Sequence, residues 1–147
     1  MNYTFNEGQI ALFPGQWADA STHILRDTDS GLSVVITRGP VPEDSDFEKE
    51  FHRQWDGMRP QMTSLQQGEF TRVSVGPDNL TRGVEVESHF ARNGVDLWQK
   101  QLAVPVADKP QMLLFTFSAL RPFSEQDEQH WSQLKASITF NPTEQDA

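Results

Sequence analysis

Strand-length segments separated by short turns fill the chain between residues 68 and 120. These segments are rich in β-branched and aromatic residues, which favour strands. Between the second and third of them, Arg92, Asn93 and Gly94 suit a tight hairpin turn. Because hairpins join antiparallel neighbours, this part of the chain favours an antiparallel sheet over a parallel Rossmann sheet. The four predicted strands are 68–75, 82–91, 95–106 and 111–120.

The first part of the chain predicts further strands, with turns between them, from Gly8 to Val41. Residues 21–39 are typical of a hairpin, because two extended runs flank the turn-forming residues 27–31. Asp27 and Asp29 in this turn resemble part of a calcium loop, but the downstream ligand spacing does not fit. We therefore expect them to stabilise the turn.

Two segments, 43–58 and 124–138, carry the spacing of helices. In the first, Ser45 and Glu48 have the spacing of a capping box. In the second, Ser124 suits the N-cap and is followed by acidic residues that favour the positive end of the helix dipole. The apolar residues expected to face the core are Phe47, Phe51, Trp55 and Met58 in the first helix and Trp131, Leu134 and Ile138 in the second.

These elements predict an α+β fold: a mainly antiparallel sheet of about six strands, flanked by two helices. At 147 residues the chain is long enough for one domain with a substantial core. We expect this single domain to span residues 1–140, followed by a polar tail over 141–147.

The formal net charge of −9 argues against nucleic acid and against an anionic membrane surface as partners. The chain has no cysteine, which excludes disulfides, thiol chemistry and lipid attachment to cysteine. Its start has neither a basic region nor an apolar run, and no apolar run approaches the ~20 residues of a membrane span. We expect a cytoplasmic protein without direct membrane anchoring.

No motif in the sequence specifies an enzyme, a cofactor or a metal: there is no phosphate loop, GxGxxG, HExxH or GxSxG. Glu85, Glu87 and His89 alternate along one strand and could reach one metal ion. Apolar residues occupy the opposite face of that strand, so we expect the charged row to be a solvated face. The three tryptophans at 55, 98 and 131 could line a ligand site, but core packing is the preferred interpretation.

The predicted strand 95–106 carries two glutamines inside an apolar row. Alternation places Gln99 and Gln101 on the same side as Leu97. Neighbouring strands have similar rows of apolar, Ser and Thr residues. Their opposite sides carry larger apolar side chains, and this heavier face suits the core under the helices. The candidate binding residues on this mixed face are Ile24, Ser33, Val35, Thr37, Leu97, Gln99, Gln101, Met112, Leu114 and Thr116.

Two interpretations of the mixed face stay open. It is either an outer face covered by a loop or a dimer partner, or a concave groove for an apolar partner. Methionine adapts its shape to varied partners, and glutamine both donates and accepts hydrogen bonds, so both residue types suit a groove for a mostly apolar helix.

The runs "YTFNEGQIALFPGQWADASTHIL" (3–25) and "LSVVITRGPVPEDSDFEKEF" (32–51), with the later order of strands and final helix, resemble the DcrB-like family. Within it they are most similar to the Eag-type chaperones of bacterial type VI secretion. The resemblance covers nearly the whole chain and implies the fold of the PsbP and Mog proteins. DcrB proper is a lipoprotein, from which this cysteine-free chain departs.

The resemblance also implies a role. Eag-type chaperones bind the N-terminal transmembrane segments of toxin effectors that carry a PAAR domain, and shield them in the cytoplasm until the effector is loaded on the secretion spike. They are typically homodimers and need no cofactor. Two other classes stay open: an adaptor that binds a soluble folded partner through its sheet face, and a small-ligand binder or enzyme.

Overall fold

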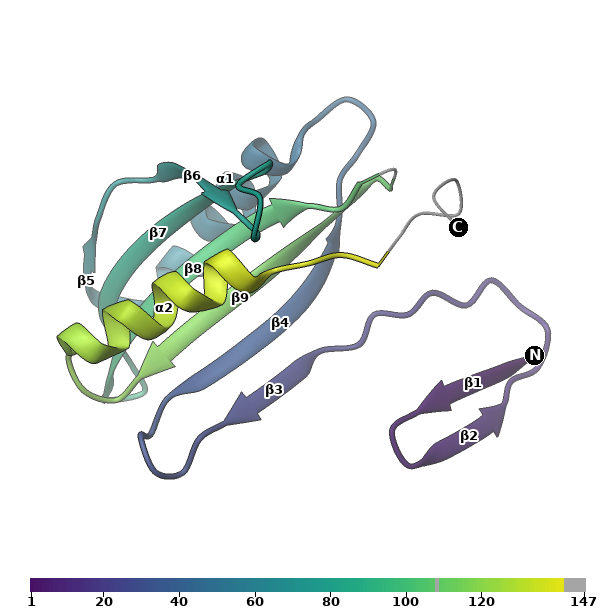
Figure 1. Cartoon of the computed structure of the whole chain (residues 1–147), viewed down its shortest axis with the longest axis horizontal. Helices are drawn as coiled ribbons and strands as arrows, with labels where there is room; N and C mark the ends of the chain where they lie inside the picture. The colour runs from purple at the N-terminus through teal and green to yellow at the C-terminus, as the bar shows by residue number, and fades with distance from the viewer. Residues whose placement is uncertain (108, 142–147) are drawn as a thin grey trace.

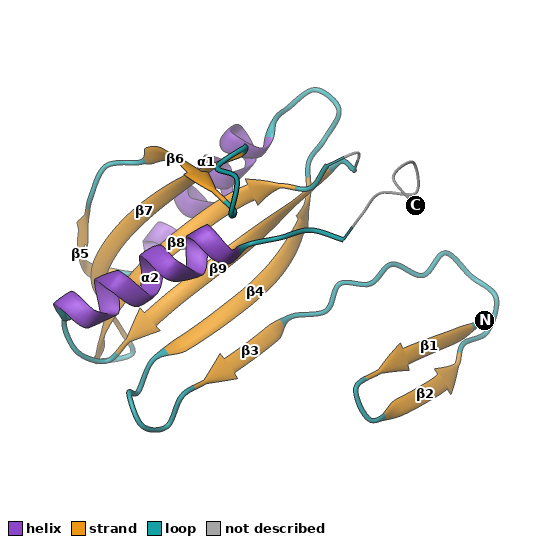
Figure 2. Ribbon diagram, in the orientation of Figure 1, coloured by secondary structure: helices purple, strands orange, loops and turns teal. Residues whose placement is uncertain are grey.

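The structure is a computed structural model that describes residues 1–107 and 109–141. Its main body is a seven-stranded antiparallel sheet with one helix against each face (Figures 1 and 2). The sheet has the strand order β3-β4-β9-β8-β7-β5, and β6 pairs with another stretch of β7. The predicted α+β class, an antiparallel sheet flanked by helices, is confirmed. Residues 142–147 of the predicted tail lie outside the described residues.

The long central strands agree with the predicted ones to within a few residues. The strands are β1 (Asn2–Phe5), β2 (Gly8–Ala11), β3 (His23–Arg26), β4 (Ser33–Pro40), β5 (Thr63–Gln67), β6 (Thr71–Val75), β7 (Thr81–Arg92), β8 (Val95–Pro105) and β9 (Gln111–Ala119). The helices are α1 (Phe47–Met58), the short 3-10 helix η1 (Arg59–Gln61) and α2 (Glu125–Ser137). Strands β1 and β5 lie outside the predicted strands.

The hairpin between β7 and β8 turns at the predicted place. Arg92 pairs with Val95, which leaves a two-residue loop of Asn93 and Gly94 with φ of 52° and 79°. Both residues tolerate this left-handed conformation, which matches the twist of the flanking strands. In the β3–β4 turn, Asp27 accepts hydrogen bonds from the Asp29 amide and the Ser30 hydroxyl. The aspartates therefore stabilise the turn, as predicted.

The predicted N-cap is right for α2 and wrong for α1. Ser124 caps α2 as predicted, in a reciprocal capping box with Asp127. The predicted Ser45 cap of α1 is wrong, because the N-cap is Asp46, whose Oδ1 accepts a hydrogen bond of 2.9 Å from the Lys49 amide. The Ser45 amide instead donates to the Pro42 carbonyl and belongs to the preceding turn.

Each helix covers its own side of the sheet, so the protein has two apolar cores. Helix α1 places Phe51 and Trp55 against one face, and α2 places Trp131 against the other. The expectation that both helices cover the heavier face is therefore wrong. Helix α2 covers that heavier face, with Leu102, Val104, Phe115 and Phe117, and α1 covers part of the mixed face.

The hairpin β1–β2 forms a separate two-stranded sheet. Figure 1 shows it standing off from the main body, to which an extended segment connects it. Among the described residues, no helix combines the length and the apolar character needed to cross a membrane.

Candidate functional site

All ten candidate binding residues lie on one face of the sheet. Strand pairing aligns Ile24 with Val35, Val35 with Thr116, and Thr116 with Gln101, and residues aligned in this way point to the same side. The pairing among β3, β4, β9 and β8 has no register shift. Strand parity, the alternation of side chains between the two faces of the sheet, therefore continues across all four strands.

Helix α1 lies over one part of this face. Leu97, Met112 and Leu114 pack into the core beneath α1, with Met112 and Leu114 buried and Leu97 partly buried. These three residues are therefore core residues of the free protein, and their apolar character is explained by α1.

Of the other seven residues, five lie on β3, β4 and β9, whereas Gln99 and Gln101 lie on β8, the strand that α1 contacts. We call all seven the open face: Ile24, Ser33, Val35, Thr37, Gln99, Gln101 and Thr116. None of them belongs to either apolar core of the described chain. Figure 2 shows α1 behind the β7–β8 side of the sheet, away from β3 and β4. Most of these residues are half-buried, Ile24 is 56% exposed, and Gln101 is 4% exposed.

Hydrogen-bonding side chains cross the open face from strand to strand. The Ser33 and Ser118 hydroxyls lie 2.7 Å apart, and Gln101 Nε2 donates to Thr116 Oγ1 at 3.3 Å. The carbonyl oxygens of Gln99 and Gln101 are buried, and neither has a hydrogen-bond partner among the described residues. A buried acceptor without a partner costs roughly 1–3 kcal/mol. A donor from a bound molecule could satisfy these two acceptors once the side chains that cover them move aside.

On the opposite side of the sheet, the charged row is only partly the solvated face that we expected, because Glu87 is exposed whereas Glu85 is partly covered by α2. Glu85 Oε2 accepts hydrogen bonds from Trp131 Nε1 at 3.0 Å and from Lys135 Nζ at 2.9 Å. Glu87 Oε2 lies 3.0 Å from Nζ of the buried Lys100. The bonds to Glu85 attach helix α2 to the sheet, and the Glu87–Lys100 pair joins β7 to β8.

Lys100 also lies 2.9 Å from Glu128 Oε2 on α2 and 4.9 Å above the ring of Phe123, so its charge is compensated although it is buried. His89 stacks on Trp98 with ring centroids 4.1 Å apart. Within residues 1–107 and 109–141, no group of three or more His, Cys, Asp or Glu side chains is placed to share a metal ion. Trp55 and Trp131 are buried in the two cores, as the preferred interpretation predicted, whereas Trp98 is half-buried and belongs to neither core.

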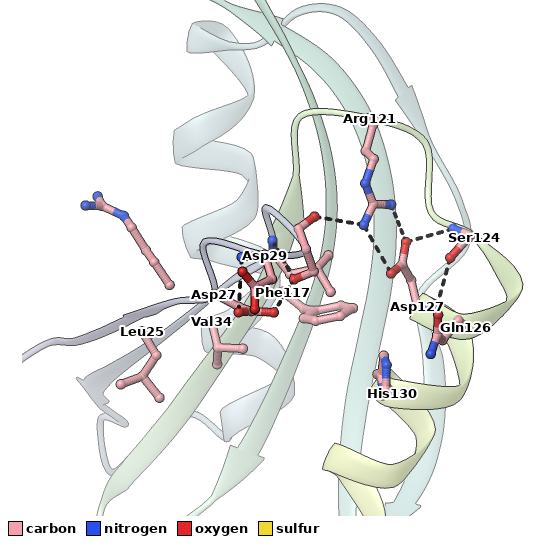
Figure 3. A pocket seen from close by; sticks show the side chains of 13 residues that line it. Leu25, Asp27, Asp29, Val34, Phe117, Arg121, Ser124, Gln126, Asp127 and His130 are labelled. Atoms are coloured by element: carbon pink, nitrogen blue, oxygen red, sulfur yellow. Dashed lines mark hydrogen bonds and ion pairs between the residues drawn. The ribbon is translucent and has the colours of Figure 1, made fainter.

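A cleft of about 710 Å³ lies between the β3–β4 hairpin and the first turns of α2 (Figure 3). Leu25, Val34 and Phe117 line it from the strands, and Gln126 and His130 line it from the helix. It opens on the α2 side of the sheet, whereas the open face lies on the α1 side.

Arg121 joins the two walls of this cleft. Its guanidinium donates to the Asp127 carboxylate in the first turn of α2 and to the Ser30 carbonyl in the β3–β4 turn, the latter at 3.0 Å. The hydrogen bond from Arg121, with help from the Ser124 amide and hydroxyl, lowers the pKa of Asp127 from 3.8 to about 2. The pair therefore stays ionised at neutral pH and keeps the turn and the helix together.

The cleft has no signature in the sequence, because its β3–β4 wall and its α2 wall lie far apart in the chain and share no local pattern. The apolar alternation of Met1, Tyr3 and Phe5 with Ile10 and Leu12, by contrast, is a local pattern that is readable in the sequence.

Comparison with known proteins agrees with this architecture. The DcrB family model matches residues 7–137. The crystal structure of PA94 from Pseudomonas aeruginosa, a protein of unknown function for which a regulatory role has been suggested, superposes with a TM-score of 0.71. The two chains are 22% identical, and the match covers 97% of this chain and 98% of PA94, so the likeness concerns the fold. No curated protein matches the chain.

Proposed function

The chain belongs to the DcrB family, and from this premise we propose that it is a type VI secretion chaperone of the Eag type. Its cargo is the N-terminal transmembrane segments of a toxin effector that carries a PAAR domain. In the cytoplasm it shields these segments until the effector is loaded on the secretion spike. It is a binding protein and not an enzyme, it needs no cofactor, and it works as a homodimer.

The observation that carries this proposal is the pair of unsatisfied carbonyl oxygens on the open face. Gln99 and Gln101 present buried acceptors on β8, and Gln101 is aligned with Thr116 on β9, which is aligned in turn with Val35 on β4. A transmembrane helix satisfies its own backbone groups. Outside the bilayer it needs a cover for its apolar surface and hydrogen-bond partners for an occasional Ser, Thr or Asn side chain. The apolar residues of the open face can cover the apolar surface, and the two acceptors can bind the polar side chains.

Hydrogen bonds of this kind contribute roughly 0.5–1.5 kcal/mol each, so they add specificity to binding that is mainly apolar. Val35, Thr37 and Thr116 are half-buried and Ile24 is exposed, which leaves apolar and methyl-bearing surface free for a helix. This combination supports a cargo helix that is mostly apolar and carries a few hydroxyl or amide groups.

The test uses a soluble reporter fused to the N-terminal apolar segment of a PAAR effector encoded beside the gene for this chain. The fusion is co-expressed with the protein, and the amount of soluble complex is measured by pull-down. We expect Ile24→Arg to reduce the complex at least tenfold, because a bound apolar helix would bury the new charge. Leu80→Arg is the control, because Leu80 is also an exposed aliphatic residue but lies outside the open face.

A double variant, Gln99→Leu with Gln101→Leu, tests the acceptors alone. It keeps an apolar surface and should weaken binding to a segment that carries Ser or Thr, with little effect on a segment made only of apolar residues. If Ile24→Arg and the double variant both retain the complex at the wild-type level while folded, the cargo does not bind the open face.

An adaptor function is the second candidate, in which the open face binds a soluble folded partner. The regulatory role suggested for the structurally similar PA94 favours it. If the protein fails to keep the apolar segment soluble, and Ile24→Arg instead abolishes the capture of a folded partner, the adaptor function replaces the chaperone function.

A further inference from the structure

The N-terminal hairpin β1–β2 has one apolar face and one polar face. Strand pairing aligns Tyr3 with Ile10 and Thr4 with Gln9, so alternate residues separate onto the two sides. The apolar side carries Met1, Tyr3, Phe5, Ile10 and Leu12, and the polar side carries Asn2, Thr4 and Gln9 together with the small Ala11.

This apolar face is largely uncovered in a single copy of the chain. Phe5 and Ile10 are 43% and 49% exposed, and Phe13 and Trp17, which follow the hairpin, are 71% and 48% exposed. Phe13 and Trp17 contact each other edge to face, and the Trp17 indole donates to the Phe13 carbonyl, so this stretch has a defined shape. An isolated two-stranded hairpin is marginally stable, and an apolar sheet face needs another layer to cover it.

The cleft between the β3–β4 hairpin and α2 has an apolar floor within a mostly polar and charged lining, and this floor could cover part of the apolar face of the hairpin. Its floor consists of Leu32, Val34 and Phe117, and Leu25 stands at its mouth with 59% of its surface exposed. Figure 3 shows Gln126 and His130 on the opposite wall. A cleft with an apolar floor and a polar rim is typical of a site that receives aromatic side chains from a partner.

We propose that residues 1–17, which we call the arm, dock in the cleft of a second copy of this chain, and that the second copy's arm docks reciprocally in the first. The chain carries both halves of this contact. The arm leaves from the His23 end of β3, whereas the cleft lies at the Arg26 end. Figure 1 shows the arm directed away from its own cleft, so this geometry favours docking of the arm in the cleft of a second copy. Exchange of an identical element is a low-cost route to a two-fold dimer.

The area that the arm offers favours reciprocal exchange. Its three exposed aromatic residues carry about 150–250 Å² each, and roughly half of that surface is free in one copy. With Met1 and Ile10, the arm offers on the order of 500 Å² of apolar surface, below the ~800 Å² per partner of a stable interface. Two arms packed against each other would therefore be insufficient. In a reciprocal exchange each copy contributes a cleft as well as an arm, so the buried area exceeds that of two arms packed together.

Charge supports the same arrangement. Each copy has a net charge of −9, so two copies repel each other over most of their surfaces. Glu7 is the only Asp, Glu, Lys or Arg among residues 1–18. The arm is thus a segment through which two copies can meet with little repulsion.

The inference rests on the homodimer proposed above and not on the identity of the cargo. The test measures the oligomeric state of the full chain by sedimentation equilibrium at micromolar concentration. We expect Ile10→Asp in the arm and Leu25→Asp in the cleft each to raise the dimer dissociation constant at least tenfold. The matched controls are Gln9→Asp on the polar side of the hairpin and Ile24→Asp on the other face of β3, and both should dimerise as the wild type does.

A mixing experiment separates exchange from simple packing of two arms. The Ile10→Asp protein keeps an intact cleft, and the Leu25→Asp protein keeps an intact arm. An equimolar mixture should therefore form a heterodimer with one intact arm–cleft contact, at concentrations where either variant alone is monomeric.

Three results would overturn the proposal: a monomeric wild type, an Ile10→Asp variant that dimerises normally, or a mixture that stays monomeric. Loss of the dimer in Ile24→Asp but not in Leu25→Asp would place the arm on the open face instead. Because Ile24→Arg tests the cargo and Leu25→Asp tests the dimer, failure of one proposal leaves the other measurable.

Discussion

At the residue scale, Gln101 combines a hydrogen bond to Thr116 with a buried carbonyl oxygen that has no partner in the described part of the chain. We predict that Gln101→Leu leaves the free energy of unfolding unchanged or raises it by about 1 kcal/mol. The removal of an unsatisfied acceptor is favourable by roughly 1–3 kcal/mol, and the lost bond costs roughly 0.5–1.5 kcal/mol. Urea unfolding of the purified protein measures the balance.

Gln67→Leu is the control for this prediction. Gln67 Oε1 accepts a hydrogen bond of 2.9 Å from Nε1 of the buried Trp55, so its replacement leaves the indole N–H without that partner. This variant should lose roughly 1–3 kcal/mol. If Gln101→Leu destabilises the protein as much as Gln67→Leu does, the Gln101 amide is fully satisfied in the free protein.

Also at the residue scale, the ion pair of Asp127 with Arg121 predicts a pH dependence. The pKa of Asp127 is lowered from 3.8 to about 2 in the folded protein. Its stabilising contribution is therefore complete above about pH 5 and is lost as the pH falls from about 4 to 2. We expect Asp127→Asn to cost on the order of 1–2 kcal/mol at neutral pH, since Arg121 is partly exposed and solvent weakens the pair.

The measurement compares the unfolding free energies of the wild type and Asp127→Asn between pH 7 and pH 2. The difference should shrink toward zero in acid. A difference that stays constant across this range would mean that Asp127 acts through its shape and its cap, with no contribution from its charge.

At the scale of elements, helix α1 depends on Asp46 for its first turn. The carboxylate accepts the Lys49 amide, one of the first amides of the helix, which have no partner within the helix itself. We predict that Asp46→Ala costs about 1 kcal/mol of unfolding free energy. Ser45→Ala should change it by less than about 0.5 kcal/mol. Thermal unfolding followed by circular dichroism tests both, and the opposite order would restore Ser45 as the cap.

At the scale of the whole molecule, the two faces of the sheet are packed to different extents. Leu114 is buried beneath α1, whereas Val35, on the same face but beyond the helix, is half-buried. We predict that Leu114→Arg abolishes cooperative unfolding, because it places an unpaired charge in the core. Val35→Arg should leave a folded protein.

Circular dichroism and thermal unfolding distinguish these outcomes. A Leu114→Arg variant as stable as the wild type would show that α1 does not pack on this part of the sheet. A Val35→Arg variant that fails to fold would show that the open face is already covered in the free protein.

Much of the fold follows from local pattern. Alternation and turn residues predict the hairpins β3–β4 and β7–β8, because side-chain direction in a strand and backbone freedom at Asn93 and Gly94 depend only on neighbouring residues. The same alternation predicts that Gln99, Gln101 and the other candidate residues share a face. Ser124 is readable as a cap because its partner Asp127 lies three residues away.

The tertiary structure decides what covers each face. The apolar stripe of α1 or α2 could pack against either side of the sheet, and only the connections through space assign one helix to each side. Hence Leu97, Met112 and Leu114 are core residues whereas Val35 is not, although strand alternation places all four on the same face. The contacts of Glu85 with Lys135 and of Arg121 with Ser30 join residues far apart in the chain. Such contacts leave no period in the sequence, because they depend on the packing of distant segments.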